Sequence, residues 1–189
     1  MSARPEVWVI RHGETEWSKS GQHTGSTDIE LTPQGETIAR AVGERLAGEK
    51  FDRVLSSPLQ RARRTAELAG FGAQVEVDPD LVEWDYGKYE GLRTVDIRKD
   101  VPDWSIWTHP ADDGESLAQI AARADAVIAR ICSAEGRVLV FSHGHYLRVL
   151  AARWATLPPE AGQHLELDTA AVGILGWYRE TPVLRRWNA

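Results

Sequence analysis

Two histidines of this sequence stand in matching settings that suit chemistry. His12 directly follows the apolar run of residues 7–10, His143 directly follows the run 138–141, and a glycine comes next in both cases. Glycine lets the backbone turn sharply and lets a ligand approach closely. A single histidine in this place is more often structural, but two in the same setting favour a functional pair.

Two arginines add groups that suit a phosphate ligand. Arg11 precedes His12, and Arg61 lies about one turn into a helix that Ser57 and Pro58 are expected to open. Guanidinium groups bind phosphate oxygens in a bidentate manner, so phosphate is the simplest common target. The competing interpretation of Arg61 is a solvated helix face, because the next two arginines of that helix are expected to point outward.

A metal site is the alternative interpretation of the histidines. His143 and His145, with His12, offer imidazole ligands, but the sequence lacks the second carboxylate-rich motif that a dinuclear hydrolase needs. We therefore predict no metal and no cofactor.

Alternating strands and helices must position these side chains. Strands are predicted at residues 7–10, 51–55, 74–77 and 138–141 and as a hairpin at 172–178 and 183–187, and helices at 32–48, 57–70, 116–134 and 146–157. Residues 78–91 are polar, aromatic and glycine-bearing, which predicts a functional loop.

This alternation predicts a three-layer α/β/α sandwich with a largely parallel central sheet, formed as one domain over residues 1–189. In such folds ligands bind outside the carboxyl ends of the strands. His12 and His143 both follow strands, so both are expected at one edge of the sheet.

Composition limits the partners. The 22 basic and 28 acidic side chains give a formal charge of −6, which disfavours nucleic acid. Cys132 is the single cysteine, so no disulfide forms within the chain and a reducing compartment fits best. No apolar segment approaches a signal core or a membrane span, so we predict a cytoplasmic protein without a membrane partner.

Several ordered motifs resemble the histidine phosphatase superfamily, which includes the cofactor-dependent phosphoglycerate mutases. They are residues 11–17 (RHGETEW), 21–28, 31–32 with Gly35, 56–62 (SSPLQRA), Glu83 with Gly87 and 90–92, and 142–144 (SHG). A lone Arg-His-Gly would be weak evidence, whereas this series covers nearly the whole chain. The resemblance implies a phosphoglycerate mutase-like fold and a phosphorylated small-molecule substrate.

The resemblance also implies residue roles. His12 would be the nucleophile, Arg11, Arg61 and His143 would bind the phosphoryl group, and Glu83 would protonate the leaving oxygen. Neutral imidazole can attack phosphorus in line, while the arginines and a preferably protonated second histidine neutralise the transition state. A raised carboxyl pKa would help the acid, and an acidic pH preference is expected.

Without the resemblance, Glu83 would be read as an ordinary loop carboxylate. Aromatic residues surround it in sequence, and packing of a lid is the favoured interpretation for most of them. They are Trp84, Tyr86, Tyr89, Trp104 and Trp107.

Hydrolysis is favoured over mutase activity. The mutases resemble this chain through Thr24, Gly25 and Tyr86, but they carry a paired-arginine segment, and residues 103–114 contain no arginine here. Ser18 replaces their asparagine. The chain most resembles the compact acid phosphatase and sedoheptulose bisphosphatase branch, which implies sugar phosphates or bisphosphates. A mutase is the second hypothesis, and a phosphate-binding module without catalysis is the third.

Further substrate contacts are predicted around this core. The resemblance adds Thr24, Gly25, Tyr86 and Gly144, and the candidates for a sugar or distal phosphate are Ser18, His23, Arg93, His145 and Arg148, the last of which could instead form a salt bridge. A homodimer is expected, because relatives often pair and Trp177 and Trp187 exceed the needs of the core.

Overall fold

The computed structural model describes residues 4–134 and 136–189, which form one mixed sheet of order β3-β2-β4-β1-β5-β6. The strands are β1 Glu6–Arg11, β2 Arg53–Ser56, β3 Val75–Val77, β4 Arg137–Ser142, β5 Val172–Tyr178 and β6 Thr181–Arg186. The first four run parallel to one another, and β5 and β6 are antiparallel additions at one side, where β5 pairs with β1. The predicted α/β class with a largely parallel sheet is confirmed.

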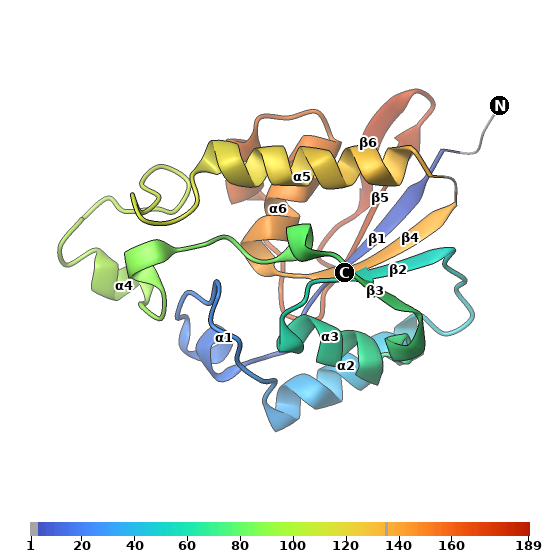
Figure 1. Ribbon diagram of the computed structural model, residues 1–189, viewed down its shortest axis with the longest axis horizontal. Helices are drawn as coiled ribbons and strands as arrows, with labels where there is room; N and C mark the ends of the chain where they lie inside the picture. Colours follow the sequence, from blue (N-terminus) through green and yellow to red (C-terminus); the bar gives the residue numbers. More distant parts are fainter. Residues whose placement is uncertain (1–3, 135) are drawn as a thin grey trace.

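Helices cover both faces of the sheet (Figure 1). α2 (Pro33–Arg45) and α3 (Gln60–Leu68) lie on one face, and α5 (Leu117–Cys132) and α6 (Gly144–Trp154) lie on the other. Residues of β1 alternate between the two cores, with Val7 and Val9 packed among residues of α5 and α6 and Ile10 among those of α2 and α3. This explains why the run is apolar at every position.

Two short helices lie on the side of the molecule towards which the parallel strands point, α1 nearer to the sheet and α4 farther out (Figure 1). α1 (Glu16–Ser20) and α4 (Thr94–Ile97) are too short to give a periodic signal, and neither was predicted. α1 depends on a capping box in which Thr15 and Ser18 each bind the other's backbone. Residues 78–91 contain only 3₁₀ turns, at Pro79–Leu81 and Gly87–Tyr89, as the loop prediction implies.

Two helix boundaries differ from prediction in ways that shape the site. α3 begins at Gln60 rather than at Ser57 and Pro58, because Asp28 Oδ1, from a distant loop, accepts the Gln60 N–H at 2.7 Å. α6 begins at Gly144 rather than at Tyr146. The first turn of α6 therefore follows His143 immediately, and its N–H groups are available to the site.

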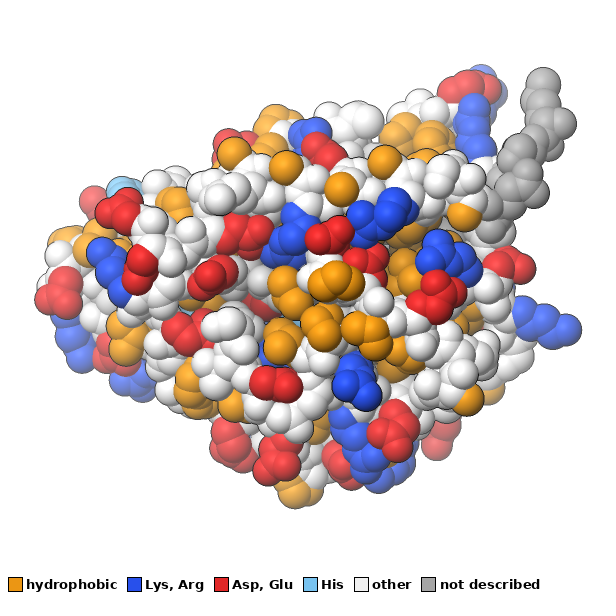
Figure 2. Space-filling model, in the orientation of Figure 1, with side chains coloured by type: hydrophobic (Ala, Val, Ile, Leu, Met, Phe, Trp, Pro, Cys, Tyr) orange, Lys and Arg blue, Asp and Glu red, His pale blue; other side chains and the backbone are white. Residues whose placement is uncertain are grey.

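The surface is mixed in charge. Figure 2 shows acidic and basic side chains interspersed over the visible face. Within the described residues, no helix is long and apolar enough to cross a membrane.

Candidate active site

His12 lies at the end of β1, in a loop that packs closely against its neighbours. The Gly13 N–H donates to Thr65 Oγ1 at 2.9 Å, and a Cβ on Gly13 would lie 2.6 Å from the Gly35 carbonyl oxygen. His12 Nδ1 lies 2.7 Å from the Gly13 carbonyl oxygen, which can only accept, so Nδ1 carries the proton and Nε2 carries the lone pair. Burial, with the Arg61 and Arg11 cations, holds the pKa of His12 well below its usual range. The ring is therefore neutral and suited to nucleophilic attack.

His143 lies beside His12, as predicted from the parallel strands, with ring centroids 5.3 Å apart. Arg61 Nε donates to His143 Nδ1 at 3.2 Å, so the proton of a neutral ring is on Nε2, which donates to Ser57 Oγ at 2.8 Å. Burial and the neighbouring Arg61 cation hold the pKa of His143 well below its usual range. The expectation of a protonated His143 is therefore wrong for this arrangement, because a guanidinium donor occupies Nδ1.

Arg61 is fully buried, so its interpretation as a solvated helix side chain is wrong. Its Nη1 donates to the Thr27 carbonyl at 2.8 Å, and its Nη2 donates to those of Thr24 and Gly25 at 3.2 and 2.8 Å. The loop at residues 24–27, which is distant in the sequence, therefore holds the guanidinium group. The helical spacing around Arg61 does not predict this contact.

Arg11 retains binding capacity towards the cavity. Its Nη1 donates to the Leu167 carbonyl at 2.6 Å, whereas its Nε is buried without a partner among the described residues. A Cβ on Gly144 would lie 3.2 Å from that Nε. Glycine at the start of α6 thus leaves room for Arg11 and for an anion beside it.

Glu83 is a buried carboxylate at the N-terminus of α6, so its interpretation as an ordinary loop carboxylate is wrong. Its Oε1 accepts the N–H groups of Trp84 and Tyr146, both at 2.8 Å, and its Oε2 accepts that of His145 at 3.0 Å. Burial raises the pKa of Glu83, and the backbone donors oppose the rise. A raised pKa is what a carboxyl group needs to donate a proton near neutral pH.

One cavity of about 180 Å³ brings these groups together. It is lined by Arg11, His12, Ser18, Gly21, Gln22, His23, Thr24, Glu83, Tyr86, Gly144, His145, Arg148 and Leu167. Of the five predicted core residues, Arg11, His12 and Glu83 line it. Arg61 and His143 lie behind this wall, joined to it through His12 and the loop at residues 24–27.

Most of the predicted outer contacts line the same cavity, but two do not. The Gly25 N–H is bound by Glu90, and Arg93 forms an ion pair with Asp96 at 2.6 Å. The structure therefore does not bring Gly25 or Arg93 to the cavity surface. Arg148 reaches it without a salt bridge among the described residues, because its Nε and Nη2 donate to the Gly162 and Gln163 carbonyls at 3.0 and 2.9 Å.

The outer wall carries two neutral histidines. Burial lowers the pKa of His23 to about 4, and burial, with the Arg148 cation, holds that of His145 well below its usual range. His145 Nδ1 shares a hydrogen bond of 2.7 Å with Tyr86 Oη. Trp84 and Trp107 pack edge to face at 5.4 Å behind them, which agrees with the packing role expected of most aromatic residues here.

Sequence reasoning missed several residues of the site. Ser57 was interpreted as a helix cap, and Glu90 as part of a motif without a role. Gln22 lies in the motif at residues 21–28 but was given no role, and Leu167 carries no sequence signal, because its position depends on how distant loops meet.

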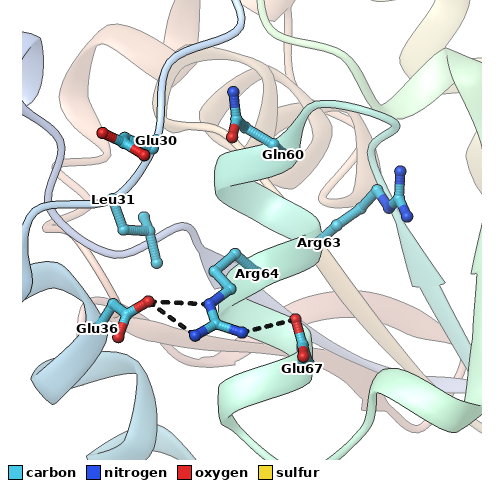
Figure 3. Close-up of a pocket in the computed structure, with 7 residues that line it drawn as sticks. All are labelled: Glu30, Leu31, Glu36, Gln60, Arg63, Arg64 and Glu67. Atoms are coloured by element: carbon cyan, nitrogen blue, oxygen red, sulfur yellow. Dashed lines mark hydrogen bonds and ion pairs between the residues drawn. The ribbon is translucent and has the colours of Figure 1, made fainter.

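A larger hollow of about 460 Å³ lies elsewhere, between α2 and α3 (Figure 3). Its lining includes Arg64, which binds Glu36 and Glu67, both at 2.9 Å. Arg63 also lines the hollow and has no ion pair among the described residues, but no histidine lies beside it, so the hollow offers less chemistry than the cavity at His12. No cluster of three or more potential metal ligands occurs in residues 4–134 and 136–189.

Comparison with known proteins identifies the family. The family model of the histidine phosphatase superfamily (branch 1) matches residues 7–189. The chain belongs to this superfamily. As a histidine phosphatase it is a phosphoric monoester hydrolase, and the predicted family and enzyme class are confirmed.

Individual relatives agree with this assignment. The chain is 44% identical over 173 residues to an acid phosphatase of Mycobacterium tuberculosis, covering 89% of this chain and 85% of that protein. It is 39% identical over 185 residues to sedoheptulose 1,7-bisphosphatase of Saccharomyces cerevisiae, covering 81% and 68%. A solved structure of a Mycobacterium tuberculosis protein has a TM-score of 0.91 at 41% identity, covering 97% of this chain and 96% of that one.

Proposed function

We propose that this histidine phosphatase hydrolyses small phosphomonoesters, in particular sugar phosphates or bisphosphates, without a metal, through a phosphohistidine on His12. The observation that carries the proposal is that His12, Arg11 and Glu83 line one cavity while Nδ1 of His12 is tied to the backbone. The names of the similar acid phosphatase and sugar bisphosphatase support the substrate class.

The reaction has two steps. His12 Nε2 forms a bond to phosphorus as the ester P–O bond breaks, and Glu83 gives its proton to the leaving alkoxide. Glu83 then takes a proton from water, whose oxygen attacks phosphorus and breaks the P–N bond. Inorganic phosphate leaves, and His12 and protonated Glu83 are restored. Arg11 and Arg61 stabilise the charge on the phosphoryl oxygens, and neutral His143 holds Arg61 in place.

The outer wall of the cavity would bind the rest of the substrate. Ser18, Thr24 and Tyr86 offer hydroxyl groups, and the neutral His23 and His145 rings can donate to or accept from sugar hydroxyls. Arg148 is the cation that a distal phosphate would meet there.

Phosphate release from sugar mono- and bisphosphates, phosphoglycerates and an aryl phosphate, measured with EDTA present, tests this proposal. We expect release by the wild type, none by His12→Ala, and wild-type release by His109→Ala, which changes an exposed histidine. Isomerisation of phosphoglycerate without release would indicate a mutase. Phosphate binding without either reaction would indicate a binding module.

A cytoplasmic homodimer is also proposed, and light scattering at micromolar concentration tests the oligomeric state. Trp177 and Trp187 give it little support, since both are half-buried and pack against the protein's own core. A monomer would remove the dimer without affecting the catalytic proposal.

A further inference from the structure

Glu90 is a second carboxylate of the loop that carries Glu83, and it binds backbone rather than cations. It follows the Gly87–Tyr89 turn, and its carboxylate accepts the Gly25 N–H at 3.0 and 2.9 Å and the Thr27 N–H at 3.0 Å. Bonds from N–H groups to an ionised acceptor are stronger than neutral ones. Glu90 therefore fixes the loop at residues 24–27 from one side.

The same loop holds Arg61 from the other side. Its carbonyl groups at Thr24, Gly25 and Thr27 accept from the Arg61 guanidinium, which also donates to His143. These bonds use four of the five N–H groups of Arg61, and one on Nη1 stays free of partners among the described residues. The direction of this free Nη1–H therefore depends on the position of the loop at residues 24–27.

The fit around the loop leaves little freedom. A Cβ on Gly25 would lie 2.6 Å from the Trp84 carbonyl oxygen and 2.7 Å from Glu90 Oε2. Beside it, His23 exchanges backbone bonds with Leu92 at 2.9 Å and with Gly91 at 2.8 Å. These backbone bonds attach residue 23 to the loop of Glu83, whereas Glu90 alone among the described side chains is bound to the N–H groups of residues 25 and 27.

We propose that Glu90 is a positioning residue, which holds residues 24–27 so that Arg61, supported by His143, keeps the geometry needed to bind the phosphoryl group. The inference rests on the proposed function and adds to it a residue that touches no substrate. Glu90 lies on the loop of Glu83 and acts on the loop that holds Arg61, so it links the predicted proton donor to the phosphate-binding groups.

The test compares Glu90→Gln and Glu90→Ala with Asp96→Asn, which alters a carboxylate of α4 paired with Arg93 and Lys99 on the surface. Three quantities are measured: kcat and KM for p-nitrophenyl phosphate, Kd for inorganic phosphate, and Tm. We expect Glu90→Ala to lower kcat/KM and phosphate affinity roughly 10- to 100-fold, since lost alignment of a catalytic group has this order of effect. Glu90→Gln, which keeps an acceptor oxygen, should fall between, and Asp96→Asn should match the wild type.

A double-mutant cycle separates positioning from general destabilisation. If Glu90 acts through Arg61, adding Glu90→Ala to Arg61→Ala should change kcat/KM and phosphate affinity less than twofold. Full additivity, or a Glu90→Ala enzyme within twofold of wild type, would overturn the inference. If Glu90→Ala does not fold, the test uses Glu90→Gln instead. The inference is then overturned if Glu90→Gln has the kcat/KM and phosphate affinity of the wild type, and if its effects on these quantities add to those of Arg61→Ala.

The outcome also distinguishes this inference from the proposed function. If the wild type releases no phosphate from any ester, the proposed function fails, and the loss or retention of inorganic phosphate binding in the Glu90 variants then decides the positioning role.

Discussion

At the scale of single residues, hydrogen bonds to the two histidine rings determine what each can do. His12 has its Nδ1 proton fixed by its own backbone, whereas both nitrogens of His143 are bound by other side chains. The two rings share a sequence setting and a sheet edge, yet only one of them retains a free lone pair in the described structure. The proposed division between His12 as nucleophile and His143 as supporting residue follows from this difference.

Glu83→Gln should separate the two chemical steps. An alkoxide leaving group needs the proton of Glu83, so kcat for a sugar phosphate should fall at least about 100-fold. With p-nitrophenyl phosphate, the nitrophenolate leaves without a proton, so the variant should still form the phosphohistidine. Hydrolysis of the phosphohistidine then lacks its general base, so stopped-flow absorbance should show a burst of nitrophenolate followed by slow turnover. Glu16→Gln, an exposed carboxylate of α1, is the matched control. Equal loss with both substrates and no burst would contradict the role of Glu83.

Ser57→Ala should weaken catalysis through His143. Removing Ser57 Oγ leaves the His143 Nε2–H without its 2.8 Å acceptor, in a fully buried position. An unpaired buried donor costs roughly 1–3 kcal/mol, so kcat/KM should fall about 10-fold or more. Steady-state kinetics with Ser133→Ala, an exposed serine at the end of α5 away from the cavity, as control checks this. A Ser57→Ala enzyme within twofold of wild type would show that this bond does not matter.

At the scale of elements, α6 and the loops around it do the positioning. The first turn of α6 presents N–H groups to Glu83, and its early start at Gly144 makes this possible. The loop at residues 24–27 places carbonyl groups against Arg61 and N–H groups against Glu90. Backbone groups therefore satisfy much of the buried charge.

Two glycine substitutions should affect function and stability separately. A Cβ on Gly144 meets Arg11 at 3.2 Å, so Gly144→Ala should lower phosphate affinity about 10-fold, while the free energy of unfolding stays equal or rises by up to about 1 kcal/mol.

A Cβ on Gly43, in α2, meets the Ala69 carbonyl oxygen at 2.8 Å, so Gly43→Ala should cost about 1–3 kcal/mol of stability and leave KM unchanged. Phosphate titration and urea unfolding of both variants check this. Unchanged phosphate affinity in Gly144→Ala, or unchanged stability in Gly43→Ala, would contradict the packing described for that site.

At the scale of the whole molecule, four histidines of the site are held neutral by burial, within a protein of net charge −6. His12, His143 and His145 have pKa values well below their usual range, and that of His23 is about 4. The fold therefore binds fewer protons at these rings than the unfolded chain does. The raised pKa of Glu83 acts in the opposite direction.

Stability should consequently fall in acid. The histidine contribution is present above pH 6.5 and is lost as pH falls towards 4, because the unfolded chain gains protons first. Urea unfolding at pH 7.5 and 4.5 should differ by at least about 2 kcal/mol. His23→Gln should reduce this dependence, and His109→Gln, at an exposed position, should not. A flat profile would contradict neutral, buried histidines.

Lowering the pH should therefore act in opposite directions on catalysis and on the stability of the fold. A protonated Glu83 favours catalysis at low pH, whereas the neutral histidines favour the fold at higher pH. The expected acid preference rests on Glu83, not on a charged His143.

The sequence by itself determined the fold class, the order of the major elements and the family. Apolar runs alternating with amphipathic segments depend on short-range periodicity, and the motifs around His12, Arg61, Glu83 and His143 are local strings of residues. Their gathering at one sheet edge followed from the rule that parallel strands share their carboxyl ends. The single-domain organisation and the residue roles stay predictions.

Only the tertiary structure decided which partners each side chain meets. Arg61 is buried against a loop more than 30 residues away, Ser57 binds His143 across 86 residues, and Arg93 turns to Asp96 instead of the cavity. The protonation of His143 depends on Arg61 and Ser57, which are distant in the sequence, so local motifs could not predict it. Hydrogen bonds between distant loops follow from the packing of the whole chain, and local patterns carry no information about them.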